Sequence, residues 1–304
     1  MNSAEFVALS LPPLLIGCLS AVACALPGNF LILRRQALIG DAISHVVLPG
    51  IVAAFLIAGT ISATAMMLGA AAAAIVAVAL IEGIRRFGRI EPGAAMGVVF
   101  TAMFAGGVLL LEITDTSGVH LDVEHALYGN LESLIWLDAT GWGSLVDPAA
   151  LSGLPDELFR ILVVLGLIVL LLVVFWRALA ISTFDEGFAA TLGLPVTAIS
   201  LGLVIVSALA AVAAFDAVGS IIVIAMFICP PAAARLMTNQ LGQQVAWSVA
   251  FALLSAIFGF VFAGYAPLWF GAANAVSAAG MIATVSGVIL AVCALWGPER
   301  SPIR

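Results

Sequence analysis

Of the 304 residues, 64% are hydrophobic and only 9% are charged, and the mean hydropathy is +1.25. Soluble domains average about 45–50% apolar and about 25% charged residues, so this composition excludes a water-soluble fold. At roughly 20 apolar residues per membrane span, the length allows about eight to ten crossings with short loops. We therefore expect an all-α integral membrane protein in which residues 1–304 form a single transmembrane domain.

The charged residues exclude two further classes of protein. The formal charge is −7, and all ten basic side chains are arginine. A phosphate-binding Walker loop requires a lysine, so this chain cannot hydrolyse ATP through such a loop. Its acidic balance gives no indication of nucleic-acid binding. The four cysteines are scattered through apolar segments, so we expect buried free thiols rather than a disulfide framework or a zinc site.

Apolar stretches separated by charged or turn residues predict nine spans. They are 11–33, 38–57, 62–84, 93–111, 159–178, 196–214, 218–236, 244–264 and 278–296. Pro230 and Pro231 interrupt the seventh stretch, which leaves eight spans as an alternative if one stretch re-enters the membrane. The first nine residues carry no lysine or arginine, so the first stretch is expected to remain as a span rather than to act as a secretory signal.

Arginine positions predict the orientation, because cytoplasmic loops are enriched in basic residues. With nine spans, every arginine except Arg160 falls on one side, which is then the cytoplasm. The N-terminus is then outside and the C-terminus is cytoplasmic. The longest polar segment, from Glu112 to Glu157, contains nine carboxylates and no arginine, and this orientation places it outside.

One ionisable pair opens the second predicted span. Asp41 and His45 are four residues apart and so share one helix face, about 6 Å apart along the axis. Ionisable groups at the centre of a membrane helix cost roughly 2.5–3.5 kcal/mol, so each is a candidate functional residue. Carboxylate suits manganese and imidazole suits zinc and iron, so the pair could bind a divalent metal. The alternative is a hydrogen-bonded pair that fills a polar gap between helices.

Two ligands are too few for a stable metal site. A second copy of this helix from a partner subunit would supply two aspartates and two histidines around a shared axis. Pro49 and Gly50 follow in the same span, and broken helices often line the substrate sites of transporters. A simple kink without functional role is the alternative for Pro49.

Two polar segments outside the spans carry further candidates. His120, Asp122, Glu124 and His125 lie in the acidic outer segment, where they could attract cations or form only a docking face. Between the fifth and sixth spans, residues 184–194 place apolar side chains among polar neighbours and end near Gly193. Thr183 or Asp185 could cap this stretch as a short helix that fits a groove in a partner. An amphipathic connector lying on the bilayer is the alternative.

Residues 33–50, with the sequence LRRQALIGDAISHVVLPG, resemble the signature of permeases in manganese/zinc/iron ABC importers. Three further blocks, within 121–130, 184–194 and 218–236, occur in the order found in that family. The first block is highly specific and the others moderately so, and together they cover most of the chain. Asp216 and the doubled Pro230–Pro231 depart from the family pattern.

The resemblance implies a transport permease of the vitamin-B12/metal-importer type, without enzymatic activity of its own, in a bacterial cytoplasmic membrane. It implies a second permease copy or a related permease, cytoplasmic ATPase subunits and an extracytoplasmic metal-binding protein. It also implies that Asp41 and His45 line the pathway of the transported Mn²⁺, Zn²⁺ or Fe²⁺, with no permanently bound cofactor. The ending of the signature, residues 44–50, is similar to manganese- and iron-type members, so manganese is expected first.

By the same resemblance, the residues that couple this chain to the ATPase are Phe184, Asp185, Glu186, Phe188, Leu192 and Gly193. Two other functions remain as alternatives. An ATP-independent secondary metal transporter or channel would not need the 184–194 segment. An intramembrane metalloprotease would need a zinc motif such as H-E-x-x-H, and no glutamate accompanies His45.

Overall fold

The computed structural model describes residues 3–37, 39–58, 63–88, 90–113, 131–269 and 276–299. Its regular elements in these ranges are helices, with no strand among them. They are α1 (Ser3–Glu5), the π-helix η1 (Phe6–Ser10), α2 (Leu11–Leu33), α3 (Ile39–Ala58), α4 (Ala63–Gly88), α5 (Pro92–Ile113), the 3₁₀ helices η2 (Leu131–Ser133) and η3 (Trp142–Val146), α7 (Pro148–Leu151), α8 (Asp156–Val174), α9 (Trp176–Phe184), α10 (Glu186–Thr191), α11 (Val196–Met237), α12 (Leu241–Trp269) and α13 (Ala278–Trp296).

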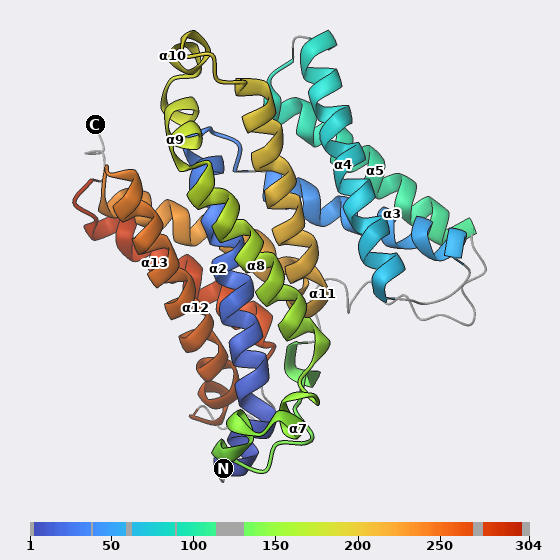
Figure 1. Cartoon of the computed structure of the whole chain (residues 1–304), viewed down its shortest axis with the longest axis vertical. Coiled ribbons are helices and arrows are strands. Elements are labelled where there is room, and N and C mark those ends of the chain that lie inside the picture. Colours follow the sequence, from blue (N-terminus) through green and yellow to red (C-terminus); the bar gives the residue numbers. More distant parts are fainter. Residues whose placement is uncertain are drawn as a thin grey trace.

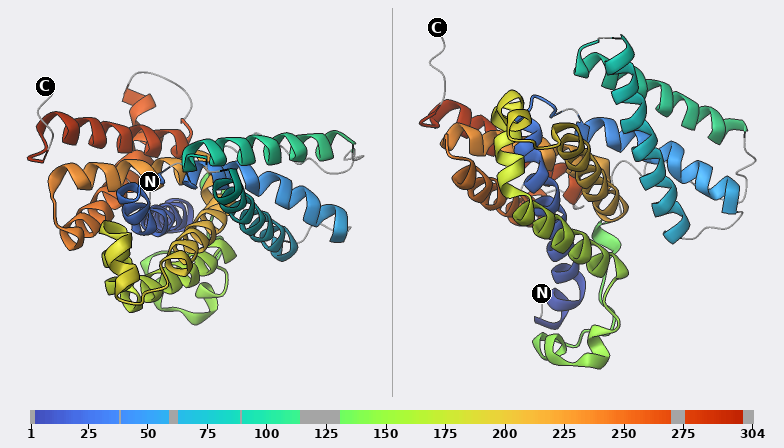
Figure 2. Two further views of the ribbon diagram at one scale, coloured as in Figure 1. Left: turned by 90° about the horizontal axis from the view of Figure 1, so that it is seen from above. Right: turned by 45° about the horizontal axis from the view of Figure 1, so that its top comes forward.

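The helices form two groups (Figure 1). Helices α2, α8, α11, α12 and α13 make a bundle around α2, and α3, α4 and α5 lie side by side on one flank. Figure 2 shows the same division from two further directions. The N-terminus lies with α7 at one end of the long axis, and α9, α10 and the C-terminus lie toward the other end. Helix α3 is strongly inclined to α2 and joins the two groups, because it contacts α4, α5 and α11.

Eight helical segments of the described chain are long and apolar enough to cross a membrane. They agree with eight of the nine stretches predicted from the sequence. The remaining stretch corresponds to α3, a 20-residue helix that contains Asp41 and His45. This confirms the predicted all-α membrane fold with eight to ten spans. A bilayer core offers no water to hydrogen-bond a free backbone, and helices satisfy their backbone groups internally.

The helices are not interrupted at the prolines, which leaves the simple kink as the alternative for Pro49. Helix α3 continues through Pro49, and α11 continues through Pro230 and Pro231 to Met237. Each proline removes one backbone hydrogen bond, and in membrane helices packing against neighbouring helices tolerates that loss. The break in α11 lies instead at Gly219, whose φ of 74° and ψ of 173° are non-helical and suit glycine.

Gly219 divides α11 into two antiparallel halves. A straight helix of 42 residues would be about 63 Å long, twice the thickness of a bilayer core. The first half begins at Val196, close to α10. Near the other end of α11, the carbonyl of Leu236 accepts a hydrogen bond from the backbone N–H of Glu299, beyond α13. Both ends of α11 therefore lie toward the same end of the molecule, and each half is a separate candidate span.

The described part of the acidic segment folds against the N-terminal helices. Trp136 is fully buried with Val7 and Ala150, and its indole N–H donates to the carbonyl of Ala150 at 2.7 Å. Its backbone N–H donates to the carbonyl of Ala8 at 2.8 Å. The carboxylate of Glu132 accepts a hydrogen bond from the backbone N–H of Ala278 at the start of α13. These contacts fix the segment to the ends of the spans.

Close contacts at small residues hold α3 against its neighbours. A side chain at Gly50 would collide with the backbone of Gly69 and with Ala73, both in α4. A side chain at Gly107 of α5 would collide with Pro49. Membrane helices associate largely through such van der Waals contacts, because the hydrophobic effect does not drive apolar side chains out of lipid. The position of the first half of α3 therefore depends on these contacts.

We expect Gly50→Ala to destabilise the protein by about 1–3 kcal/mol, because the added methyl group overpacks the contact between α3 and α4. The matched control is Gly97→Ala in α5, where an added Cβ meets no atom within 4 Å. That change should gain up to about 1 kcal/mol of helix propensity. Thermal unfolding of the purified protein in detergent measures both. Equal midpoints for the two variants would contradict the close packing at Gly50.

Candidate metal site and neighbouring polar clusters

Asp41 and His45 lie in the first two turns of α3 and face each other. The distance from Asp41 Oδ1 to His45 Nε2 is 3.4 Å. The side chains are 29% and 36% exposed, so they are partly open rather than sealed between helices. Asp41 is also in the first turn of α3, where the helix dipole stabilises a negative charge. The spacing predicted this shared face.

An aromatic wall from α5 positions the imidazole. The ring of His45 stacks on Phe100, with centroids 5.3 Å apart and an interplanar angle of 21°. Phe104, one turn further along α5, meets the same ring edge-on at 5.6 Å and 80°. Aromatic rings prefer these offset and edge-on arrangements, so they restrict the rotation of the imidazole. The two contacts leave the Nε2 edge directed toward Asp41.

The pair is not a complete metal site within the described part of the chain. Among the described residues, no group of three or more His, Cys, Asp or Glu side chains could hold a metal ion. Pro49 lacks the N–H that would bond the carbonyl of His45 four residues earlier, so this oxygen lacks its usual α-helical donor. The arrangement therefore offers one carboxylate and one imidazole, and any further ligands must come from elsewhere.

The 184–194 segment contains a well-terminated short helix, α10. Asp185 caps it, since its Oδ1 accepts a hydrogen bond from the backbone N–H of Phe188 at 2.8 Å. Gly193 ends it in a left-handed conformation with φ of 77°. The N–H groups of Gly193 and Leu194 bond to the carbonyls of Ala190 and Ala189, which is a Schellman motif. The predicted capped helix is confirmed, and Asp185 rather than Thr183 is the cap.

Three large apolar side chains of this segment are exposed. Phe184, Phe188 and Leu192 are four residues apart and are 60%, 54% and 54% exposed. Ala189, in the middle of α10, is fully buried. Glu186 lies in the first turn of α10. The structure therefore gathers the six residues predicted for this segment on one short helix and its two ends.

Arg34, at the end of α2, is the centre of a polar cluster. Its Nε donates to Thr183 Oγ1 at 3.0 Å, and its two terminal nitrogens donate to Ser182 Oγ at 2.8 Å and Ser200 Oγ at 2.6 Å. Burial lowers the pKa of the guanidinium from its ordinary value, and the negative charge of Glu186 acts in the opposite direction. The three acceptors within hydrogen-bond distance are neutral hydroxyls.

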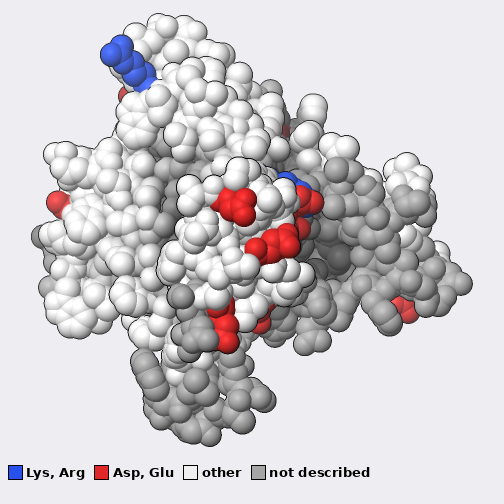
Figure 3. Space-filling model, turned by 60° about the horizontal axis from the view of Figure 1, so that its bottom comes forward, with Lys and Arg blue, Asp and Glu red and all other residues white. Residues whose placement is uncertain are grey.

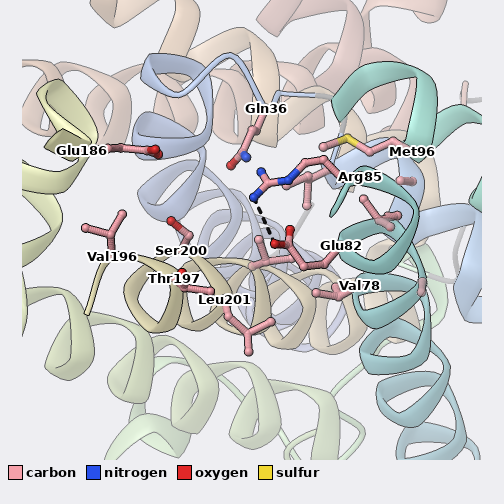
Figure 4. Close-up of a pocket in the computed structure, with 15 residues that line it drawn as sticks. Gln36, Val78, Glu82, Arg85, Met96, Glu186, Val196, Thr197, Ser200 and Leu201 are labelled. Carbon is pink, nitrogen blue, oxygen red and sulfur yellow. Dashed lines mark hydrogen bonds and ion pairs between the residues drawn. The ribbon is translucent and has the colours of Figure 1, made fainter. Parts of the chain in front are cut away.

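A cavity of about 310 Å³ lies beside this cluster, between α4, α10 and the first turns of α11 (Figure 4). Its polar lining includes Gln36, Glu186, Ser200 and the ion pair of Glu82 and Arg85, in which the N–O distance is 3.1 Å. In Figure 4, Glu186 faces Gln36 and Arg85 from the opposite wall. The Oε1 atom of Gln36 is buried and has no hydrogen-bond partner among the described residues.

The opposite end of the molecule is acidic (Figure 3). Exposed carboxylates at Asp138, Asp147 and Asp156 lie near α7 and the start of α8, and Arg160 is one turn further along α8. The predicted outer residues His120, Asp122, Glu124 and His125 lie outside the described residues.

Sequence reasoning missed three groups at this site. Phe100 and Phe104 lie in an evenly apolar helix, and only contact with α3 distinguishes them. Arg34 served as a marker of orientation, although its place at the start of the signature, residues 33–50, could have indicated an anchoring role. The Glu82–Arg85 pair, three residues apart on α4, carried a sequence signal that pointed to helix stabilisation alone.

The chain belongs to the ABC 3 transport family, whose model matches residues 8–138 and 150–296. It is 39% identical to the manganese transport system membrane protein MntD of Bacillus subtilis, over 94% of this chain and 92% of that protein. It is 36% identical to the zinc transport system membrane protein TroD of Treponema pallidum, over 97% of this chain and 76% of that protein.

A solved structure supports the same assignment. PsaBC from Streptococcus pneumoniae in complex with Fab matches with a TM-score of 0.73 and 26% identity, over 95% of this chain and 92% of that one. The family and the fold together make this chain the multi-pass membrane permease component of an ABC transport system.

We expect Asp185→Ala to destabilise α10 by about 1 kcal/mol, because the backbone N–H of Phe188 loses its acceptor. Amide hydrogen exchange should speed up about fivefold at residues 188–191 and stay unchanged in α8. Asp185→Asn is the matched control, since an asparagine oxygen caps about as well. Unchanged exchange in Asp185→Ala would show that the cap does not hold the helix.

Proposed function

We propose that this chain is the permease of an ATP-driven importer of divalent transition metal, with manganese first and zinc or iron next. The observation that carries the proposal is the geometry of Asp41 and His45. The names of the relatives support the metal class, since MntD belongs to a manganese system and TroD to a zinc system. The ion is the substrate of transport and passes through the site.

The distance between Asp41 Oδ1 and His45 Nε2 is compatible with two ligands of one shared ion. An N–H···O hydrogen bond is about 2.7–3.2 Å long, and this distance is 3.4 Å. Two ligand atoms each about 2.1 Å from one ion in tetrahedral geometry are roughly 3.4 Å apart. The carboxylate also supplies negative charge that offsets part of the charge of a divalent cation. If the pair were only a structural hydrogen bond, we would expect a shorter distance between the two atoms and side chains buried between helices.

A second permease copy, or a related permease, would complete the ligand set. The open side of the Asp41–His45 pair, with exposures of 29% and 36%, leaves access for a second pair. Two aspartates and two histidines would neutralise the ion and fill its coordination. The site would then exist only where two permeases meet, so the ion could be released when the two copies move apart.

The energy source would be a separate ATPase subunit in the cytoplasm. The chain has no lysine and hence no Walker loop, so it would not hydrolyse ATP alone. The exposed apolar side chains of Phe184, Phe188 and Leu192 are suited to a groove on such a subunit. In this arrangement α10 and the C-terminus lie on the cytoplasmic side of a bacterial inner membrane. The acidic end would then receive an extracytoplasmic metal-binding protein.

Asp41→Asn tests the metal site. The amide keeps the shape and hydrogen bonding of the carboxylate but removes the charge that offsets the cation. We expect Mn²⁺ uptake by cells that also carry the ATPase to fall at least about tenfold, the loss that about 1.4 kcal/mol of charge stabilisation produces. His45→Gln should behave in the same way, while membrane abundance of both variants should match the wild type.

Glu91→Gln is the matched control, because Glu91 is an exposed carboxylate between α4 and α5, away from the pair. It should leave uptake unchanged. Normal uptake by Asp41→Asn at wild-type abundance would refute the site. Full uptake by the wild type without an ATPase subunit would instead favour the secondary transporter or channel.

The double variant Phe184→Ala, Phe188→Ala tests the contact of α10 with the ATPase. Each buried phenylalanine contributes about 1.5–3 kcal/mol to an interface, so removing both should uncouple ATP hydrolysis from transport. The control is Phe159→Ala, Phe175→Ala at the two ends of α8, which removes two phenylalanines of similar exposure from outside the 184–194 segment. Co-purification with the ATPase and Mn²⁺ uptake measure the effect. Full transport by the first double variant would exclude this contact.

A further inference from the structure

Arg34 connects the two flanks of α10 to the turn that precedes α3. Ser182 and Thr183 lie at the end of α9, directly before α10, and Ser200 lies in the first turns of α11, shortly after it. All three hydroxyls accept hydrogen bonds from the one guanidinium, at 2.8, 3.0 and 2.6 Å. A single planar group therefore holds both ends of the α9–α10–α11 connection to the end of α2.

Backbone hydrogen bonds restrain the turn from Arg34 to α3. Arg35 adopts a left-handed conformation with φ of 57°, and the N–H of Gln36 bonds back to the carbonyl of Leu31 at 2.8 Å. The N–H of Ile39, the first residue of α3, bonds to the carbonyl of Gln36 at 3.0 Å. Backbone hydrogen bonds thus connect the end of α2 to the start of α3, two residues before Asp41. A displacement of Arg34 would therefore move the start of α3 with it.

In the contact with Arg34, the hydroxyl groups act as hydrogen-bond acceptors and the guanidinium acts as the donor. Ser182 Oγ donates its own hydrogen to the carbonyl of Ala178 at 2.7 Å, which leaves its lone pairs for Arg34. Guanidinium is planar and presents its donors in a fixed fork, so it can bridge three separate acceptors that the single nitrogen of a lysine cannot reach together. The acceptors are neutral, so the cluster holds its shape by geometry rather than by pairing of opposite charges.

We propose that Arg34 is a positioning residue that transmits the movement of α10 to Asp41 and His45 on α3. The inference rests on the proposed function, because it assigns the path by which an ATPase at α10 would open or close the metal site. The cavity of about 310 Å³ beside Ser200 and Glu186 leaves room for this movement against α4. Arg34 touches neither the ion nor the ATPase in this arrangement.

The experiment uses the permease assembled with its ATPase subunit in lipid vesicles, and it measures ATP hydrolysed per Mn²⁺ transported. Ser200→Ala removes one acceptor, and we expect this ratio to rise about tenfold, since a hydrogen bond to a charged group is lost. Ser200→Thr keeps the hydroxyl, and the cavity has space for its methyl group, so the ratio should stay within about twofold of the wild type. Arg34→Lys keeps the charge but loses the fork and should behave like Ser200→Ala.

Arg177→Lys is the matched control, because Arg177 is an exposed arginine on α9 and should tolerate lysine with an unchanged ratio. A normal ratio in Ser200→Ala at any abundance would show that the cluster is only structural and would overturn the proposal. The proposal would also be overturned if Ser200→Thr raised the ratio of ATP hydrolysed to Mn²⁺ transported as much as Ser200→Ala. A wild-type complex that transports no Mn²⁺ at all would contradict the proposed function itself, which separates the two failures.

Discussion

The close approach of α3 to its neighbours is the constraint on which the candidate site depends. Each ionisable side chain in a membrane helix costs roughly 2.5–3.5 kcal/mol, and lipid supplies no hydrophobic drive to press helices together. Gly50 and Pro49 let α3 contact α4 and α5 at van der Waals distance, and these contacts offset part of that cost. The aromatic wall of Phe100 and Phe104 exists only because α5 is held there.

The positions of the spans could be predicted because apolar length is set by the bilayer and is visible in the sequence. The effect of the prolines could not. Pro49, Pro230 and Pro231 read as interruptions, yet the helices continue through them because packing against neighbouring helices tolerates one lost hydrogen bond. The turn in α11 was predicted within a few residues, because the stretches 196–214 and 218–236 were separate, but only the φ of 74° identifies Gly219 as the residue that makes it. Whether a helix bends depends on what packs beside it, and that information is not local.

The candidate site likewise has features that could be predicted from local sequence and features that depend on packing between distant segments. The spacing of Asp41 and His45 places them on one face of any helix, so their proximity followed from the sequence. The cap at Asp185 and the stop at Gly193 followed from local turn chemistry in the same way. The cluster of Arg34 joins residues about 150 positions apart, so it follows only from the packing of α2 against α9 and α11.

The energies at α10 are matched to the role proposed for Arg34. An ATPase that covers Phe184, Phe188 and Leu192 could gain at most about 4.5–9 kcal/mol from burying them, taking about 1.5–3 kcal/mol for each side chain. The three hydrogen bonds of Arg34 are each worth about 1.5–3 kcal/mol, because the donor is charged. The hydrogen bonds of Arg34 therefore contribute about as much free energy as the contact between the ATPase and α10. A movement of α10 would then displace the α2–α3 turn before it broke these hydrogen bonds. A single hydrogen bond would yield first, and α3 would then stay where it is when α10 moves.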